Sequence, residues 1–289
     1  MIEYSKKAWC DGKYLELNEI SIPVYSYGLH YGASVYEGIR IYNSKAFKLT
    51  QHMERFIFSS DQLQMKIDYI IDQLCEVTNL LIKENDLAYG YIRSIIWRGA
   101  GDLLIGSKTK PSVAIFMWGR MSPFIRNIHD KKPQSLTVAK YTRYNEASYP
   151  AGAKIGGLYV SNSLSKYIAV EQGYDDAIML TYDGKVAEAT TSNFFVVKNN
   201  VIYTPTTKNI LNGITRLTVI DLARNLGIEV RELDFDMGFL DDAEEIFLTG
   251  TACEIAPVGR VNQREYKVGL ITEKIYNAFI KMIEVYDGF

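Results

Sequence analysis

The chain has 289 residues, of which 47% are hydrophobic and 23% charged, so it can bury a large core and is expected to form two packed units. Its formal net charge is −2 and its basic residues are scattered, which argues against a nucleic-acid or membrane-surface partner. The three cysteines form no CxxC pair and no segment reaches the length of a bilayer span, so we expect a cytoplasmic protein.

Turn signals recur between apolar stretches along the chain. They are Asp11-Gly12, Asn43-Ser44, Asp183-Gly184 and Asn199-Asn200. Such pairs favour short hairpin turns, so much of the sheet is predicted to be antiparallel. Helical periodicity is found near residues 51–64, 67–84, 158–172, 214–226 and 269–285. Because strands and helices do not alternate strictly, we expect a mixed α+β fold rather than a parallel barrel or a Rossmann fold.

The segment 121–133 is polar, carries prolines near both ends and lacks periodicity, which is typical of a connecting loop. The expected organisation is therefore an N-terminal domain of residues 1–120, an interdomain loop of residues 121–133 and a C-terminal domain of residues 134–289.

Lys154 lies in Ala151-Gly152-Ala153-Lys154-Ile155-Gly156-Gly157, where almost no side-chain bulk surrounds its amine. Glycines allow a flat ligand to approach closely, and an apolar surround disfavours the ammonium form. A neutral amine can attack a carbonyl, so Lys154 is a candidate for covalent catalysis. The alternative is a solvated lysine on a glycine turn.

A carboxylate, a helix start and a turn could hold a ligand that has a pyridine ring and a phosphate. Glu188 is predicted at a strand end, where it could hold the proton of a pyridine nitrogen or be an ordinary surface glutamate. Leu211-Asn212-Gly213-Ile214-Thr215-Arg216 opens a helix whose N–H groups attract phosphate, although an ordinary cap fits it too. Thr251, in the turn after a buried strand, could add a hydroxyl.

Arg55 stands on a predicted helix and could close a phosphate site, or be an exposed arginine. Strand alternation puts Tyr91 and Arg93 on one face, where together they could grip a carboxylate. Trp118 could line a pocket or be a packing residue.

The histidines lack the spacing of a metal site, so no metal is expected. His30 and His52 are predicted to be buried and hydrogen-bonded.

Together these stretches resemble the fold type IV pyridoxal-phosphate enzymes, which are D-amino acid aminotransferase-like, and most closely the branched-chain amino acid aminotransferases. The matching motifs are Leu29-His30-Tyr31-Gly32, Val35-Tyr36-Glu37-Gly38-Ile39-Arg40, His52-Met53-Glu54-Arg55, Tyr91-Ile92-Arg93, Ala153 to Tyr159, Glu188 with Asn193, Gly213 to Arg216, and Gly250-Thr251-Ala252 with Glu254. The resemblance implies a small N-terminal α/β domain, a larger C-terminal domain carrying the lysine, and pyridoxal 5′-phosphate between them in a homodimer or higher homo-oligomer.

The resemblance also assigns cofactor roles. It implies that Lys154 holds the cofactor covalently and moves a proton, while Glu188 binds the pyridine nitrogen. The remaining implied cofactor ligands are Arg55, the N–H groups of Ile214 and Thr215, the hydroxyls of Thr215 and Thr251, Tyr159 at the ring hydroxyl, and Leu211 packed on the ring.

The implied reaction is ping-pong transfer of an amino group between leucine, isoleucine or valine and 2-oxoglutarate. The implied substrate ligands are Tyr91 with the backbone of Thr251 and Ala252 for the α-carboxylate, Arg93 for the distal carboxylate of glutamate, and Tyr36, Tyr159, Trp118 and Tyr31 of the partner subunit for an apolar side chain.

The chain departs from the family pattern on the substrate side. Ser94 replaces a proline, Met121 replaces a tyrosine, the glycine loop at residues 98–106 looks long, and residues 190–193 are less glycine-rich. A D-amino acid or (R)-amine transaminase and an aminodeoxychorismate lyase therefore stay open, although Tyr91-Ile92-Arg93 favours the branched-chain type and no Arg-x-His pair follows Arg98. The alternative outside enzymes is a non-catalytic phosphate-ligand-binding protein.

Overall fold

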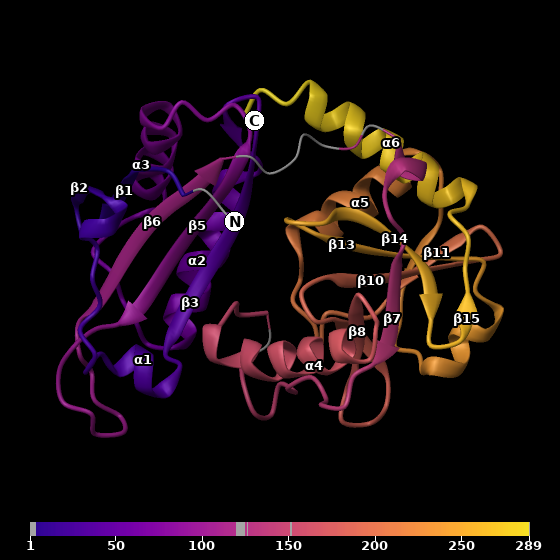
Figure 1. Cartoon of the computed structure of the whole chain (residues 1–289), viewed down its shortest axis with the longest axis horizontal. Helices are drawn as coiled ribbons and strands as arrows, with labels where there is room; N and C mark the ends of the chain where they lie inside the picture. Colours follow the sequence, from indigo (N-terminus) through magenta and orange to yellow (C-terminus); the bar gives the residue numbers. More distant parts are fainter. Residues whose placement is uncertain (1–3, 120–124, 126, 151, 289) are drawn as a thin grey trace. The chain divides into compact units, whose positions relative to one another are not determined.

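The computed structural model describes residues 4–119, 125, 127–150 and 152–288. The chain divides into two compact units, one from residues 1–123, 153–158 and 284–289 and the other from residues 124–152 and 159–283. Figure 1 draws most of the first unit in indigo to magenta, and the second in pink to yellow.

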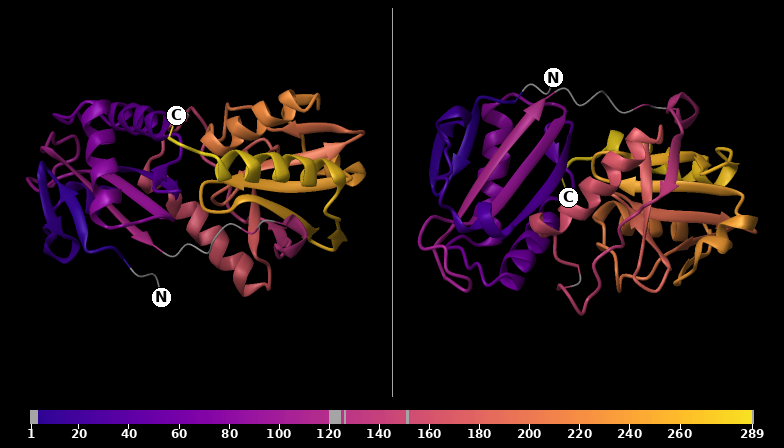
Figure 2. Two further views of the ribbon diagram at one scale, coloured as in Figure 1. Left: turned by 90° about the horizontal axis from the view of Figure 1, so that it is seen from above. Right: turned by 60° about the horizontal axis from the view of Figure 1, so that its bottom comes forward.

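The first unit is built on an antiparallel sheet. Its strands are β1 (Lys7–Cys10), β2 (Lys13–Glu16), β3 (Ser34–Tyr42), β4 (Lys45–Ala46), β5 (Gly90–Arg98) and β6 (Pro111–Gly119), in the order β2-β1-β6-β5-β3-β4. The helices are η1 (Leu17–Glu19, 3-10), α1 (Tyr27–Tyr31), α2 (Leu49–Gln62) and α3 (Ile71–Glu84). Figures 1 and 2 show β3, β5 and β6 side by side.

The two faces of β3 have different neighbours because successive side chains point to opposite sides of a strand. Val35, Glu37 and Ile39 are fully buried on the face that α2 covers. Tyr36 and Gly38 belong to the other face. The polar residue Glu37 therefore occupies a position that the alternation reserves for the core.

Residues 153–158 pack with the first unit, although the sequence analysis assigned them to the C-terminal domain. Ile155 forms an antiparallel bridge with Val35, and η3 (Gly156–Leu158, 3-10) follows directly. The bridge uses the part of β3 that the two-residue strand β4 does not reach, because β4 pairs only with Ile41 and Tyr42. Hydrogen bonding to β3 thus fixes the segment that carries Lys154.

The second unit contains a small closed barrel. Its strands are β7 (Gln134–Val138), β8 (Asp176–Leu180), β9 (Val186–Ala189), β10 (Asn193–Lys198), β11 (Val201–Thr204), β12 (Val230–Glu232), β13 (Glu245–Gly250), β14 (Glu254–Val261) and β15 (Arg264–Glu265). The path β10-β13-β14-β7-β8-β9 closes on itself where β9 pairs with β10. Its helices are η2 (Ile128–Asp130, 3-10), α4 (Tyr159–Glu171), α5 (Ile214–Asn225), η4 (Met237–Asp242, 3-10) and α6 (Leu270–Glu284).

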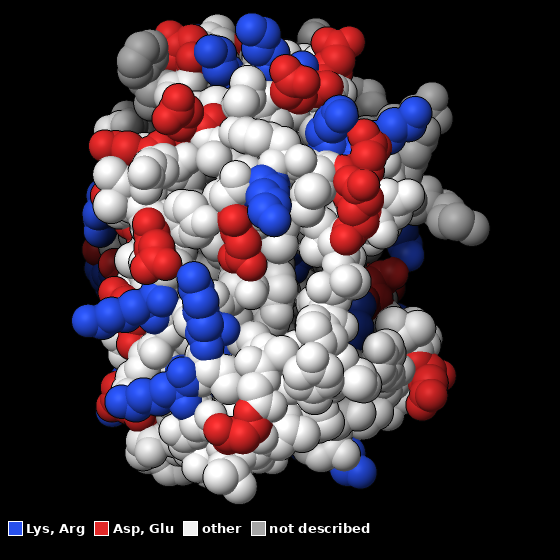
Figure 3. Space-filling view, turned by 90° about the vertical axis from the view of Figure 1, so that its left-hand side faces the viewer, with Lys and Arg blue, Asp and Glu red and all other residues white. Residues whose placement is uncertain are grey.

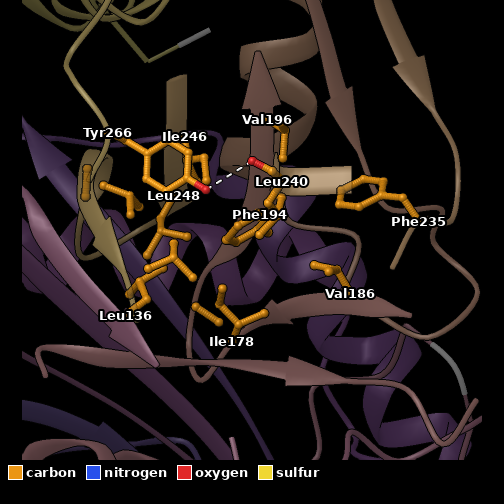
Figure 4. Packing of buried hydrophobic residues seen from close by; sticks show 14 residues of the cluster. Leu136, Ile178, Val186, Phe194, Val196, Phe235, Leu240, Ile246, Leu248 and Tyr266 are labelled. Atoms are coloured by element: carbon orange, nitrogen blue, oxygen red, sulfur yellow. Dashed lines mark hydrogen bonds between the residues drawn. The ribbon is translucent and has the colours of Figure 1, made fainter. Parts of the chain in front are cut away.

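The barrel is filled by apolar side chains from most of its strands. Figure 4 shows Leu136, Ile178, Phe194 and Leu248 converging, and the Tyr266 hydroxyl donates a hydrogen bond to Leu240 O at 3.1 Å. Burying each large side chain contributes about 1.5–3 kcal/mol. This rigid core supports the loops at the barrel's rim.

The expected mixed α+β fold and the four hairpin turns are confirmed. The turns join β1 to β2, β3 to β4, β8 to β9, and β10 to β11. Asp11, Asn43, Ser44, Asn199 and Asn200 have positive φ, which Asn and Asp tolerate well. All five predicted helices are present within a few residues, whereas the single-turn helix α1 was missed because five residues are too short to show a period.

Part of the predicted interdomain loop, residues 121–124 and 126, lies outside the described residues, as does the departure at Met121. The described part of this segment contains η2. None of the helices in the described part of the chain has the length and apolar character of a membrane span. On the face drawn in Figure 3, acidic side chains (red) and basic side chains (blue) are interspersed with one another.

Asp175 ties the turn after α4 to the start of β7. It accepts hydrogen bonds from Lys132 Nζ at 2.7 Å, Ser135 N at 2.9 Å and Ser135 Oγ at 2.8 Å. Burial alone would raise its pKa, but these bonds outweigh burial and lower the pKa from 3.8 to about 2. A lowered pKa means that the ionised carboxylate stabilises the fold.

We expect Asp175→Asn to lower the free energy of unfolding by about 1–2 kcal/mol at pH 7. The lowered pKa stabilises the fold fully above pH 4, and this contribution disappears as the pH falls towards 2. Urea unfolding of both proteins between pH 7 and pH 3 measures the difference, with Asp221→Asn on the exposed side of α5 as the control. A difference that does not shrink with acidification would contradict the assignment.

Candidate active site

The backbone of Lys154 is held on both sides. Its N–H donates to Ser59 Oγ at 2.9 Å, and its carbonyl accepts from Tyr36 N at 3.2 Å. Ser59 in turn donates to Arg55 O at 2.7 Å, which links the lysine to α2. The half-buried side chain places Nζ 4.8 Å from the centre of the Tyr36 ring. The chain thus fixes the lysine through main-chain contacts and leaves the amine over an aromatic face.

Arg55 is mostly buried, with 13% of its side chain exposed, and it is paired with Glu37. Arg55 Nε and Nη2 donate to Glu37 Oε1 and Oε2 at 2.7 and 2.9 Å, and His52 Nδ1 lies 2.7 Å from Glu37 Oε2. Burial would raise the pKa of Glu37, but Arg55 and His52 outweigh burial and hold it far below its ordinary value. Burial lowers the pKa of His52 despite Glu37.

The predictions for the two histidines differ in outcome only in the burial of the side chain. His52 is buried and hydrogen-bonded, as expected. For His30 only the hydrogen bond is confirmed, because its Nε2 lies 2.8 Å from Val24 O, whereas the predicted burial is wrong, since His30 is exposed at the end of α1. A helix of one turn has too little surface to cover a side chain at its last turn.

Four predicted substrate residues meet on the face of the first sheet that α2 does not cover. The Arg93 guanidinium lies 4.6 Å from the Tyr36 ring and 5.9 Å from the Tyr91 ring. Tyr91 stacks on Trp118 with ring centres 4.8 Å apart. These residues form a wall of aromatic rings with one guanidinium, suited to a substrate that is apolar in part and anionic in part. Tyr31 is exposed, and its hydroxyl donates to Leu103 O at 2.8 Å.

Gly38 makes room for Tyr91. A Cβ added to Gly38 would lie 2.0 Å from Tyr91 Oη, so an alanine would displace the phenol. If Tyr91 binds the α-carboxylate of an amino-acid substrate, as the resemblance implies, Gly38→Ala should raise KM by about tenfold or more, because losing a hydrogen bond to a charged group costs about 1.5–3 kcal/mol.

Steady-state kinetics measure the effect of Gly38→Ala. The control is Gly238→Ala, whose nearest neighbour would be Asp236 Oδ1 at 3.3 Å. An unchanged KM in Gly38→Ala would contradict the assignment of Tyr91 to the substrate α-carboxylate.

Glu188 lies on β9 in the second unit. Ala189 contributes to the barrel's apolar core, so strand alternation turns the preceding Glu188 to the outer side, where Asn193 lies opposite it. A register shift between Met179 and Leu180 lets Val186 contribute to the core as well.

The Glu188 carboxylate is buried and bonded on both oxygens. Oε1 lies 2.8 Å from Arg143 Nη2, whereas Oε2 accepts from Asn193 Nδ2 at 3.0 Å and from Leu211 N at 3.3 Å. Arg143 is itself buried, and its Nη1 donates to Asn162 Oδ1 at 3.4 Å. A guanidinium at this distance stabilises the ionised carboxylate.

Asn193 joins Glu188 to the start of α5. Its Nδ2 also donates to Leu211 O at 2.8 Å. A Cβ on Gly213 would lie 2.1 Å from Asn193 Oδ1, so only glycine fits there. Helix α5 begins at Ile214, and the N–H groups of its first turn, including Thr215, have no carbonyl within the helix to bond. The chain therefore presents an ionised carboxylate and a helix N-terminus from connected loops.

Thr251 and Ala252 form the turn after β13. Thr251 is half-buried and Ala252 is exposed. Lys131 Nζ donates to Cys253 O and Ile255 O, both at 2.9 Å, which ties this turn to the segment before β7. Glu254, the first residue of β14, has a φ of 59°. Tyr159, the remaining predicted site residue, is the first residue of α4 and is half-buried.

Sequence reasoning assigned no role to three residues of this candidate site, Glu37, Ser59 and Arg143, and it predicted of His52 only that it is buried and hydrogen-bonded. Only Glu37 left a readable signal, because it interrupts an apolar stripe at a core position of a strand. Arg143 lies outside regular structure, where no period indicates which way a side chain points.

The model of the family described as Amino-transferase class IV matches residues 34–261. The chain belongs to this family. A class IV relative from Rickettsia bellii, named "Probable branched-chain-amino-acid aminotransferase", is 35% identical over 269 residues, which cover 92% of this chain and 91% of the relative. The resemblance inferred from the sequence is thereby confirmed.

Solved class IV structures share the fold. The branched-chain amino acid aminotransferase from Escherichia coli matches with a TM-score of 0.89 at 32% identity, covering 98% of this chain and 96% of that one. The branched-chain amino acid aminotransferase from Thermobaculum terrenum, solved in its PLP-bound holo form, matches with a TM-score of 0.88 at 29% identity, covering 98% of this chain and 95% of that one. The expected fold type IV architecture is therefore confirmed.

The described residues of this aminotransferase fit pyridoxal 5′-phosphate. A lysine with a fixed backbone can bond an aldehyde, and a buried carboxylate held as an anion can match a protonated ring nitrogen. A mostly buried arginine and a helix N-terminus both suit a phosphate.

Proposed function

We propose that the protein is a pyridoxal-phosphate-dependent aminotransferase that moves an amino group between a branched-chain L-amino acid and 2-oxoglutarate by a ping-pong mechanism. The observation that carries the proposal is the full-length similarity, at 31–35% identity, to enzymes named branched-chain-amino-acid aminotransferase. When bound, pyridoxal 5′-phosphate withdraws electrons from the substrate Cα and so stabilises a carbanion there.

Lys154 would perform the covalent step and the proton transfer. Its main-chain bonds to Ser59 and Tyr36 fix the Cα, so the flexible side chain can swing without moving the backbone. The amine would first bond the cofactor and then, once an amino acid has replaced it, move the proton from the substrate Cα.

Glu188 would hold the proton on the ring nitrogen. Arg143 keeps the carboxylate charged, and Asn193 and the Leu211 N–H fix its direction. An anion in a buried site stabilises the protonated nitrogen far more than it would in water.

The remaining cofactor contacts are proposed from the family pattern. The phosphate would bond Arg55, the N–H groups of Ile214 and Thr215, and the hydroxyls of Thr215 and Thr251. Tyr159 would donate to the ring hydroxyl, and Leu211 would pack on the ring. The burial of Arg55 and the position of Ile214 as the first residue of α5 support these assignments.

The substrate would meet the aromatic wall. Tyr91 and the backbone of Thr251 and Ala252 would bind the α-carboxylate, and Arg93 the distal carboxylate of glutamate. The residues proposed to contact an apolar side chain are Tyr36, Tyr159, Trp118 and Tyr31 of the partner subunit. The stacking of Arg93 on Tyr36 supports a site that accepts both substrate types.

A homodimer or higher homo-oligomer is proposed, supported by the exposed apolar side chains of Leu29 and Tyr31 on α1 and of Leu104 and Ile105 in the loop after β5. Residues 121–133 are proposed as the interdomain connection. A cytoplasmic location agrees with the three free cysteines. Light scattering of the purified protein measures the oligomeric state.

The proposed function is tested by colour and by half-reactions. The purified protein should be yellow, and borohydride should fix the cofactor to Lys154. L-leucine and L-glutamate should change the absorption spectrum, while D-alanine and a simple primary amine should not. A protein that stays colourless with added pyridoxal phosphate would contradict the proposal. A spectral response to D-alanine alone would favour a D-amino acid transaminase.

A further inference from the structure

Glu37 is an unusual charged residue, because it lies on the apolar face of a central strand. Its neighbours on that face, Val35 and Ile39, are fully buried, and so is Glu37 itself. A lone carboxylate in such a place is strongly destabilising, so a buried one is paired and hydrogen-bonded. The partners of Glu37 must therefore stabilise its charge.

Both partners come from one face of α2, three residues apart. Arg55 contacts Glu37 through Nε and Nη2, and His52 contacts it through Nδ1. Because its pKa is lowered, His52 is neutral at pH 7, and the hydrogen-bond pattern assigns its proton to Nδ1. Glu37 thus accepts three hydrogen bonds from these two side chains and carries the charge that balances Arg55.

This arrangement fixes the plane of the Arg55 guanidinium. The edge formed by Nε and Nη2 engages both carboxylate oxygens, so the guanidinium cannot rotate about its last bonds. The guanidinium bonds Glu37 through the edge formed by Nε and Nη2. Its end, formed by Nη1 and Nη2, faces a different direction. Fixing a long side chain before a ligand arrives removes an ordering cost from binding.

We propose that Glu37, itself fixed by His52, is a positioning residue that orients Arg55 towards the cofactor's phosphate and thereby sets the preference of the site for the phosphorylated cofactor over pyridoxal. This inference rests on the proposed function, in which Arg55 binds that phosphate. Glu37 and His52 act through Arg55 and do not touch the cofactor.

A purely structural role for Glu37 makes a different prediction. If the carboxylate only neutralised a buried arginine, its loss would loosen the whole first unit and weaken binding of pyridoxal and pyridoxal phosphate alike. If it orients Arg55, only the ligand with a phosphate is affected. The preference ratio, which is Kd for pyridoxal divided by Kd for pyridoxal phosphate, separates these roles.

The experiment is a titration of cofactor-free protein with pyridoxal phosphate and with pyridoxal, followed by tryptophan fluorescence. Glu37→Gln should raise Kd for pyridoxal phosphate by about tenfold to a hundredfold, as expected for charge-assisted hydrogen bonds, and change Kd for pyridoxal by less than about threefold. The control is Glu245→Gln, another buried glutamate, which accepts from Thr272 N at 2.7 Å. It should leave the preference ratio unchanged.

Two results would overturn the proposal. One is a preference ratio in Glu37→Gln within about threefold of the wild-type ratio, and the other is tighter binding of pyridoxal phosphate, which would mean that the carboxylate mainly repels it. If Glu37→Gln does not fold, two variants of His52 test the proposal instead. His52→Asn keeps an N–H near the position of Nδ1 and should keep the preference ratio. His52→Leu removes that N–H and should lower the preference ratio. Equal ratios in this pair would also overturn the proposal. A wild-type protein that binds neither ligand would instead refute the proposed function.

Discussion

Lys154→Ala is expected to lower the rate of amino transfer between leucine and 2-oxoglutarate by at least about a thousandfold. The change removes the amine that is proposed to bond the cofactor and to move the proton at the substrate Cα. The contacts that hold this residue, to Ser59 Oγ and Tyr36 N, come from its backbone and survive in alanine. The loss should therefore be chemical, with the fold unchanged.

Stopped-flow absorbance of the half-reaction with L-leucine measures this loss, and thermal unfolding of the cofactor-free protein checks the fold. Lys267→Ala, at an exposed lysine before α6, is the control and should keep full activity. If Lys154→Ala keeps more than about a tenth of the wild-type rate, Lys154 is not the covalent residue.

Local signals account for what the sequence predicted correctly. Asn43-Ser44 and Asn199-Asn200 reveal hairpins because these residues tolerate the positive φ that a tight turn requires, and this is a property of two adjacent residues. Long helices such as α6 repeat their apolar stripe several times. Helix α1 has five residues and shows no period, so it could not be found.

Contacts between distant residues were not predictable in the same way. Arg143 and Glu188 are 45 positions apart, and no local residue pattern indicates that their side chains form an ion pair. The assignment of residues 153–158 to the first unit depends on how short β4 is. Lys154 and Glu188 became candidates through their local sequence, and the resemblance to a known family added their roles, whereas the residues that hold them required the fold.

Glu188→Gln is expected to slow the half-reaction with L-glutamate by about a hundredfold to a thousandfold. Glutamine has the same shape but no charge, so it cannot stabilise a protonated ring nitrogen. It also leaves Arg143, which is 8% exposed, without its counter-charge. Breaking a buried pair in this way costs about 3–5 kcal/mol, so the free energy of unfolding should fall together with the rate.

The double variant Glu188→Gln/Arg143→Gln separates these two effects. Removing both charges eliminates the unpaired guanidinium, so urea unfolding should show that most of the lost stability returns. The rate of the half-reaction should stay low, because the anion that is proposed to hold the ring proton is still missing. Recovery of the rate together with the stability would mean that Glu188 acts only through the fold, whereas stability without rate assigns the carboxylate to the chemistry.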